Sequence, residues 1–367
     1  MSVAPAWRDV RNLLCVRLDN MGDVLMTTPA LRALRRALPG CRLTLLASNA
    51  GAQVAPHVPE VDETVAYDAA WVKNDAAGND QDRSRLEWLR ARRFDAAVIF
   101  TVYSQSALPA ALMCHLAGIP RVLAHARENP YRLIGDWVRE TEPQQGVRHE
   151  VRRQLDLVAR IGARTDDTRL SFAIGEQARG GMRRALREAG LVREEGWIVA
   201  HCGASAASRR YPAERYAEAL ALLRGTGRGI LLTGSRAERE LTASIAARCG
   251  AGGDVVDLAG RLSLGELGAL IERAGVLVSN NSGPVHIAAA LGTPVVDLYA
   301  LTNPQHTPWQ VPHRLLNFDV PCKYCYRSVC PEGHHDCLAR VEPQAVAGAA
   351  RELLELPRHA GPLPAAA

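Results

Sequence analysis

Residues 274–294 read AGVLVSNNSGPVHIAAALGTP, and this stretch predicts how the second half of the chain folds. Its first part, residues 275–279, is a short apolar run of the length of a buried strand. Residues 284–291 follow four polar residues and begin with proline, a preferred first residue of a helix. The first N–H groups of such a helix have no intrahelical partners, so Ser282 and Gly283 would lie where a phosphate could bind. An ordinary capped turn between a strand and a helix has the same pattern.

The order of strand, polar turn and helix recurs along the whole chain. Residues 12–18 form an apolar run, a turn with one glycine follows, a helical pattern covers residues 24–38, and residues 42–47 form the next strand. Such units build a parallel sheet with helices on its faces. Further strands are expected at residues 63–66, 95–100, 121–124, 197–201, 229–233, 254–258 and 295–298. Further helices are expected at residues 86–92, 106–118, 148–162, 177–190, 213–223, 236–249, 264–273 and 343–356.

We therefore predict an α/β protein with two Rossmann-like, doubly wound domains that face each other across a cleft. The first domain covers residues 1–170 and the second covers residues 176–356, including a cysteine-rich segment at 320–340. Residues 357–367, rich in proline and alanine, are expected to be a disordered tail. Residues 70–85 are polar and are expected to form an exposed loop, in which Asp80 and Asp82 are solvated.

The composition is that of a soluble globular protein, with 367 residues, 47% hydrophobic and 23% charged. The formal net charge of +5 is compatible with an anionic substrate or a membrane surface, but it is too weak to indicate nucleic acid binding. No apolar run has the length of a membrane-spanning helix, and residues 1–12 lack the apolar core of a signal peptide. We therefore expect a cytoplasmic protein.

Asp23 is the first candidate for chemistry, in the sequence RLDNMGDVL. It follows the first strand at the carboxyl edge of its sheet, where doubly wound folds bind their ligands. A carboxylate there could act as a general base, or it could simply stabilise the first turn of a helix. The turn has one glycine where a dinucleotide-binding fingerprint needs three, so a nicotinamide dehydrogenase is disfavoured.

Two turns of the second domain could hold the phosphates and the ribose of a nucleotide. In the stretch HCGASAASRRYP at residues 201–212, Arg209 and Arg210 stand just before a helix and could bind a diphosphate. Adjacent arginines can also be merely solvated. In the turn at residues 234–240, a carboxylate could accept hydrogen bonds from ribose hydroxyls, or it could be a surface charge on a helix.

Four of the nine cysteines are concentrated in one segment with the spacing C-x2-C-x4-C-x6-C. Four thiolates so close together could hold a structural zinc ion, and disulfides are disfavoured in the cytosol. Free thiols are the alternative, because the spacing is not that of a standard zinc finger or ribbon. The residues are Cys322, Cys325, Cys330 and Cys337.

Three motifs in order give the chain a resemblance to a known family. VRLDNMGDVLMTTPALRALR, then RRYP, then SNNSGPVHIAAALGTP with the cysteine segment, resemble glycosyltransferase family 9, the lipopolysaccharide heptosyltransferases. The resemblance extends from about residue 13 to residue 354. It implies the GT-B architecture, with the acceptor on the first domain and the nucleotide-sugar on the second, and inverting transfer without a metal.

The resemblance also implies roles for individual residues. Asp23 would be the general base, beside Asn20, Met21 and Gly22 in the acceptor-side loop. Members usually have Asp where this chain has Asn281, so we expect position 281 to bear on the choice of donor. The donor-binding residues would be Ser205, Arg209, Arg210, Glu238, Asn281, Ser282, Gly283, Pro284 and His286.

The resemblance implies a transferase that moves heptose from ADP-heptose to a lipopolysaccharide inner-core acceptor, with no cofactor required for catalysis. Basic residues at 148–160 and 83–93 could help the protein approach an anionic glycolipid at the inner membrane surface. Three alternatives remain open. They are a transferase with another nucleotide-sugar for O-antigen, capsule or a small glycoside, a nucleotide-sugar epimerase, and a non-catalytic nucleotide-binding protein.

Overall fold

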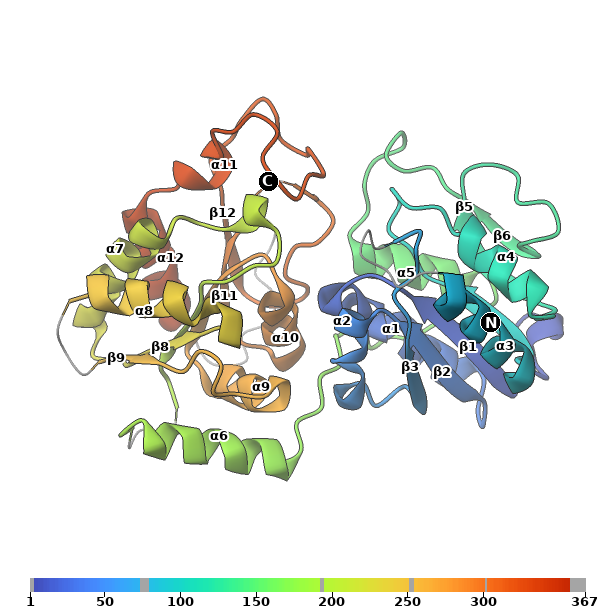
Figure 1. Ribbon diagram of the computed structural model, residues 1–367, viewed down its shortest axis with the longest axis horizontal. Helices are drawn as coiled ribbons and strands as arrows, with labels where there is room; N and C mark the ends of the chain where they lie inside the picture. Colours follow the sequence, from blue (N-terminus) through green and yellow to red (C-terminus); the bar gives the residue numbers. More distant parts are fainter. Residues whose placement is uncertain (1–2, 73–78, 192–194, 251–253, 301, 357–367) are drawn as a thin grey trace. The chain divides into compact units, whose positions relative to one another are not determined.

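The computed structural model describes residues 3–72, 79–191, 195–250, 254–300 and 302–356. The chain divides into two compact units, Met1–Ala173 and Ile174–Ala367. Each unit contains a six-stranded parallel sheet with helices on both faces (Figure 1). The predicted α/β class, with a doubly wound sheet in each half of the chain, is confirmed.

The first unit is built on a sheet with the strand order β3-β2-β1-β4-β5-β6. Its strands are β1 (Asn12–Arg17), β2 (Arg42–Ala47), β3 (Glu63–Ala66), β4 (Ala96–Ile99), β5 (Val122–Ala126) and β6 (Asp136–Arg139). Its α-helices are α1 (Met21–Ala37), α2 (Asn49–Ala52), α3 (Asn79–Arg92), α4 (Leu108–Leu116) and α5 (Glu150–Ala159). The chain turns from one side of the sheet to the other between β1 and β4, and ligands of doubly wound folds bind at such a switch point.

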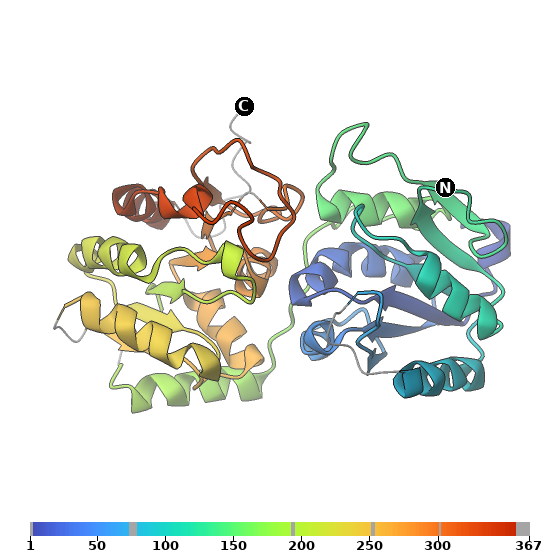
Figure 2. The ribbon, with the colours of Figure 1, turned by 45° about the horizontal axis from the view of Figure 1, so that its top comes forward.

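Side chains of β1 alternate between the two faces of this sheet. Leu14 and Val16 belong to a core that α3 and α4 cover, together with residues such as Leu89 and Cys114. Arg17 has the opposite orientation, because its guanidinium contacts Asp23 of α1 and Glu150 of α5. Helices α1 and α5 lie side by side on that face of the sheet (Figure 2). A charged residue at the end of β1 is therefore buried between two helices.

The second unit has the strand order β12-β11-β10-β7-β8-β9. Its strands are β7 (Ile198–His201), β8 (Ile230–Thr233), β9 (Val255–Asp257), β10 (Val276–Asn280), β11 (Val295–Leu298) and β12 (His313–Leu316). Its α-helices are α6 (Glu176–Glu188), α7 (Ala213–Leu223), α8 (Arg239–Arg248), α9 (Leu264–Arg273), α10 (Gly283–Leu291), α11 (Asp336–Ala339) and α12 (Pro343–Leu354). Its switch point lies between β7 and β10.

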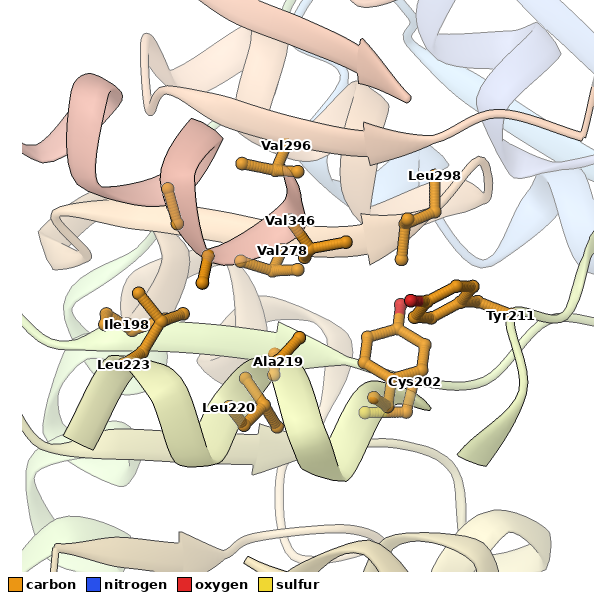
Figure 3. Packing of buried hydrophobic residues seen from close by; sticks show 14 of the residues in the cluster. Ile198, Cys202, Tyr211, Ala219, Leu220, Leu223, Val278, Val296, Leu298 and Val346 are labelled. Carbon is orange, nitrogen blue, oxygen red and sulfur yellow. The ribbon is translucent and has the colours of Figure 1, made fainter. Parts of the chain in front are cut away.

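A dry core fixes one face of this second sheet. Ile198, Val278 and Val296, from three neighbouring strands, pack against Leu220 of α7 and Val346 of α12 (Figure 3). Full burial of an aliphatic side chain is worth about 1.5–3 kcal/mol. The core therefore holds the sheet rigidly and leaves the loops at its carboxyl edge to carry the site.

Several local predictions were wrong. Helix α3 begins at Asn79, so the second half of the expected loop at 70–85 is helical, and the hydroxyl of buried Tyr67 donates to Asp82 at 2.7 Å. The strands β6 and β12 and the short helix α11 were not predicted. The expected tail at 357–367 lies outside the described residues. Within the described ranges, no helix has both the length and the apolarity to cross a membrane.

Candidate active site

Asp23 lies at the carboxyl edge of the first sheet, in the first turn of α1. The helix begins at Met21, three residues earlier than predicted, so Asp23 is a helical residue and Asn20 is its N-cap. The Asp23 carboxylate is 8% exposed, and its Oδ2 accepts a hydrogen bond from the backbone N–H of Asn20 at 3.0 Å. Met21 and Gly22 are half-buried beside it. The cap holds Asp23 close to the surface with a fixed orientation.

Arg17 holds the second oxygen of Asp23. Its Nη2 lies 3.1 Å from Asp23 Oδ1 and 2.9 Å from Glu150 Oε1, while its Nε lies 3.1 Å from Asp19 Oδ2. The guanidinium is completely buried. We call these four residues the Arg17 cluster: one cation from β1, two carboxylates from the β1–α1 region and one from the first turn of α5.

Burial and mutual repulsion shift the ionisation of this cluster. Desolvation raises the pKa of both Asp19 and Glu150, although Arg17 opposes that shift in each case. Burial alone would lower the pKa of Arg17, but the three carboxylates raise it above its ordinary value. Arg17 is therefore a permanent cation beside two carboxylates, Asp19 and Glu150, whose pKa values burial raises.

A pocket of about 250 Å³ opens at the switch point of this sheet, beside the cluster. Asp19, after β1, and Thr101, after β4, both line the pocket, as do Trp71 and Gln105. The side-chain amide of Gln105 donates to Asp19 Oδ1 at 2.6 Å. The pocket thus combines an aromatic wall, hydroxyl groups and a carboxylate, a surface of the kind that suits a sugar.

Sequence reasoning missed Arg17, Asp19 and Glu150. The sequence held one signal for Arg17: it is a charged residue at the end of an apolar strand, on the same face of the strand as the buried Leu13 and Cys15. Glu150 gave no such signal, because it lies more than 120 residues away and contacts Arg17 only through the packing of α5.

In the second unit, the N-terminus of α10 lies at the switch point, next to the end of β10. The helix begins at Gly283, one residue earlier than predicted, so Ser282 is the N-cap residue; its hydroxyl does not cap the helix, and its Oγ has no hydrogen-bond partner in the described structure. Gly283 and Pro284 are the first two helical residues, and His286, the fourth, is buried. A helix of nine residues therefore presents its first turn at the sheet edge with an unused hydroxyl.

Asn280 ties together the two loops that meet at this switch point. Its side-chain amide donates to the carbonyl of Cys202 at 2.7 Å, and its oxygen accepts from the N–H of Tyr211 at 3.0 Å. These bonds fix the loop after β7 against the end of β10. The predicted site residues included neighbouring Asn281 but not Asn280.

Asn281 bonds to the protein interior. It is 4% exposed, and its Nδ2 donates to Asp297 Oδ2 at 2.9 Å and to the carbonyl of His306 at 3.0 Å. Burial raises the pKa of Asp297 to about 7, against the opposing effects of Asn281 and Arg209. Asn281 therefore joins β10, β11 and the segment that follows Tyr299.

The two adjacent arginines have different surroundings. Arg209 is half-buried and its Nη2 donates to Asn303 Oδ1 at 3.0 Å, whereas Arg210 is exposed and donates to the carbonyl of Ala204 at 2.8 Å. Ser205 is exposed in the same loop. Arg209 thus lies against the segment that Asn281 anchors, and it is held by a neutral partner that leaves its charge available.

Glu238 lies against the loop after β7. A Cβ on Gly203 would come within 1.8 Å of Glu238 Oε1, so only glycine allows this approach. Glu238 Oε2 also accepts from the N–H of Ser235 at 2.7 Å. The structure therefore brings Glu238 to the same carboxyl edge as Arg209 and Ser282.

The cysteine segment packs on this loop as well. His335 contacts the carbonyl of Ser208 at 2.6 Å, and the hydroxyl of Ser208 donates to the carbonyl of Arg327 at 2.7 Å. All four cysteines are free and line a small cavity. Across the ranges that the structure describes, no three His, Cys, Asp or Glu side chains are placed to hold a metal ion, so zinc stays a prediction from spacing.

The basic face expected on α5 is only partly available. Arg153 is 1% exposed and forms ion pairs with Glu140 and Glu142, so it does not face solvent. Arg148 pairs with Glu142 and Asp156. Helix α5 thus buries one cation, Arg153, that the sequence pattern placed on its surface, because Glu140 and Glu142 near β6 compensate its charge.

Comparison with known proteins places these features in a family. The sequence model of "Glycosyltransferase family 9 (heptosyltransferase)" matches residues 83–335. Lipopolysaccharide heptosyltransferase 3 of Escherichia coli K12 is 27% identical over 301 residues, which cover 79% of this chain and 82% of that protein. Lipopolysaccharide heptosyltransferase 1 of Pseudomonas aeruginosa is 25% identical over 373 residues, which cover 94% and 98%.

Solved structures are similar in fold. The glycosyltransferase family 9 protein from Veillonella parvula gives a TM-score of 0.76 at 22% identity, covering 94% of this chain and 97% of that one. ADP-heptose LPS heptosyltransferase II of E. coli gives 0.73 at 24% identity, covering 94% and 98%. These similarities, with the two doubly wound sheets, confirm the predicted GT-B class.

Proposed function

Since the chain belongs to glycosyltransferase family 9 and is a glycosyltransferase, we propose that it moves a heptose from ADP-heptose to a lipopolysaccharide core acceptor, with inversion. Relatives named as lipopolysaccharide heptosyltransferases support this substrate class, as does a fold neighbour titled as an E. coli heptosyltransferase with ADP. The observation that carries the proposal is the Asp23 carboxylate, fixed at the carboxyl edge of β1 and joined through Arg17 to Asp19, which lines a pocket with an aromatic wall.

In this mechanism Asp23 is the general base. The acceptor hydroxyl gives its proton to an Asp23 oxygen while its oxygen forms a bond to the anomeric carbon of the donor. The bond between that carbon and the phosphate oxygen breaks, and ADP leaves with the electron pair. One displacement inverts the configuration at the anomeric carbon.

The second unit would stabilise the leaving diphosphate. The first turn of α10 supplies N–H groups and a positive dipole end, and Arg209 supplies a full positive charge. Ser282 and Ser205 would add hydroxyl donors, and Glu238 would accept from the ribose. Together these groups would provide the charge stabilisation that other transferases take from a divalent cation, so we propose that transfer needs no metal.

The proposal includes an acceptor at the membrane surface. A core acceptor carries anionic groups on a lipid, and the chain has an excess of basic residues, with a net charge of +5. A cytoplasmic protein in peripheral contact with the inner membrane would reach such an acceptor.

A panel of nucleotide-sugars incubated with the purified protein and a truncated core acceptor tests the function. Mass spectrometry should detect a heptosylated product with ADP-heptose and none with UDP- or GDP-sugars. Transfer from another donor would instead indicate an O-antigen, capsule or glycoside transferase. Conversion of a donor without acceptor would indicate an epimerase, and binding without any turnover would indicate a non-catalytic protein.

Arg209→Ala is expected to weaken binding of ADP by about 10–100-fold, because a charge-assisted hydrogen bond to phosphate is worth about 1.5–3 kcal/mol. Calorimetry would measure the dissociation constant, which should become less sensitive to salt. Arg215→Ala is the matched control, because Arg215 lies in α7 and bonds to the carbonyl of Val341. Unchanged affinity in Arg209→Ala would remove Arg209 from the phosphate site.

A further inference from the structure

The contact between Arg17 and Asp23 poses a chemical problem for the proposed mechanism. A cation 3.1 Å from a carboxylate stabilises the charged form and makes that carboxylate a weaker base. The first turn of α1 has the same effect, because the helix N-terminus is positive. A general base, by contrast, works best with a pKa near the operating pH. A second feature must therefore offset Arg17.

The other carboxylates of the Arg17 cluster supply that offset. The same guanidinium faces Asp19 at 3.1 Å and Glu150 at 2.9 Å, and Glu150 binds the same Nη2 atom as Asp23. One positive charge is therefore divided among three carboxylates. Two of them, Asp19 and Glu150, have no other ion-pair partner within 4.0 Å in the described structure. The neighbouring amides of Gln105 and Gln154 are neutral.

Two arginines near the cluster, Arg148 and Arg153, form ion pairs with carboxylates outside it. Arg153 approaches Glu150 from the same helix, but it is paired with Glu140 and Glu142. Arg148 pairs with Glu142 and Asp156. Burial and the nearby arginines lower the pKa of His125 to about 3, so it is neutral. Arg148 and Arg153 therefore each have carboxylate partners outside the Arg17 cluster.

We propose that Arg17, Asp19 and Glu150 are positioning residues for the general base: Arg17 orients Asp23, and Asp19 and Glu150 offset its charge so that Asp23 can accept a proton. This inference rests on the proposed function. It assigns an active role to Glu150, a completely buried carboxylate with one oxygen that has no hydrogen-bond partner in the described structure.

The test is the pH profile of kcat/KM in Glu150→Gln. The amide keeps the shape of Glu150 and can still meet Gln154, but it removes one negative charge from Arg17. Arg17 then stabilises the charged form of Asp23 more strongly, so the acidic limb should move to lower pH by roughly one unit. At a given pH on that limb, kcat/KM relative to its plateau should therefore be about ten-fold higher than in the wild type. The plateau should fall several-fold, because the base is weaker.

Two further variants separate this role from a structural one. Asp19→Asn, at the edge of the pocket, should shift the acidic limb in the same direction. Glu142→Gln is the matched control: Glu142 is as buried as Glu150 but binds Arg153 and Arg148 instead of Arg17. It should lower the melting temperature and leave the acidic limb unchanged.

The inference is overturned if folded Glu150→Gln and Asp19→Asn both keep the wild-type acidic limb while wild-type protein transfers heptose. It is also overturned if Glu142→Gln shifts the limb equally, since any buried charge would then have the same effect. Absence of transfer by wild-type protein with every donor would instead contradict the proposed function. Calorimetric binding of ADP, which is assigned to the other unit, should remain unchanged in all three variants.

Discussion

Asp23→Asn is expected to lower kcat by about 10²–10⁴-fold while the affinity for ADP stays within about two-fold of wild type. The asparagine oxygen can still accept from the N–H of Asn20, so the first turn of α1 should persist. It cannot take a proton, so the acceptor hydroxyl would have to attack without a base. Single-turnover kinetics at saturating donor measure this loss on the chemical step itself.

The variant also removes one carboxylate from Arg17, so its stability needs a separate measurement. Asp19 and Glu150 still neutralise the guanidinium, and we expect Asp23→Asn to remain folded. Glu266→Gln is a suitable control. Glu266 has the equivalent capping position in α9, where its Oε2 accepts from the N–H of Ser263 at 2.7 Å.

Glu266→Gln should cost only a fraction of the capping energy, about 0.5–2 kcal/mol at most, and leave transfer intact. Near-wild-type turnover by Asp23→Asn would exclude Asp23 as the base. An equal loss of turnover in both variants would show that damage to a helix cap, rather than loss of a base, explains the effect.

The fold was largely predictable because strong local patterns coincide with its central elements. Parallel strands buried on both faces are mostly apolar, as in β4 and β8, and the helices between them begin and end at proline, glycine or polar residues. The predicted bounds of α7, α9 and β11 agree with the structure. The edge strands β6 and β12 are half-exposed and mixed in character, so their sequences resemble loops.

The candidate site was predictable only where one segment carries the signal. Asp23 and Ser282 each lie in a single strand-turn-helix unit, which the sequence displays directly. The residues that orient Asp23 and Ser282 lie in other segments, so the sequence does not display them in the same way. Glu150 reaches Arg17 across 133 positions, and Asn281 meets Asp297 through the pairing of β10 with β11. Such contacts follow from tertiary packing, which a pattern read along one chain does not contain.

The Asn281–Asp297 pair offers a physical reason for the asparagine at position 281, where the family resemblance leads us to expect aspartate. An aspartate at position 281 would direct an oxygen, instead of an N–H group, toward Asp297 Oδ2 and toward the carbonyl of His306. Asp297 is completely buried. Two carboxylates at this distance cannot both be ionised without a large cost, so this chain can have an acid at one of the two positions.

Asn281→Asp is therefore expected to destabilise the protein by about 3 kcal/mol at pH 8, the scale of an uncompensated buried charge. The loss should be smaller at pH 6. Burial already raises the pKa of Asp297 to about 7, so the folded state retains a proton that the unfolded chain releases near pH 4. Asp297 therefore contributes stability at low pH that is lost as the pH rises from about 4 to about 7. In Asn281→Asp, the second carboxylate extends this loss above pH 7.

Asp297→Asn in the same chain should restore at least half of the lost stability, because an amide at 297 can donate to the new carboxylate at 281. Asp297→Asn alone is the matched control and should change stability little at pH 8, since it removes a buried charge rather than adding one. Urea unfolding at pH 6 and pH 8 would supply the double-mutant cycle.

The Michaelis constant for the donor should change in parallel with stability across the four proteins, because Asn281 also anchors the segment that contacts Arg209. If Asn281→Asp is as stable as wild type at pH 8, the contact with Asp297 does not explain why this chain has asparagine at position 281. If stability is restored in the double variant while the donor preference stays altered, position 281 acts on the donor directly.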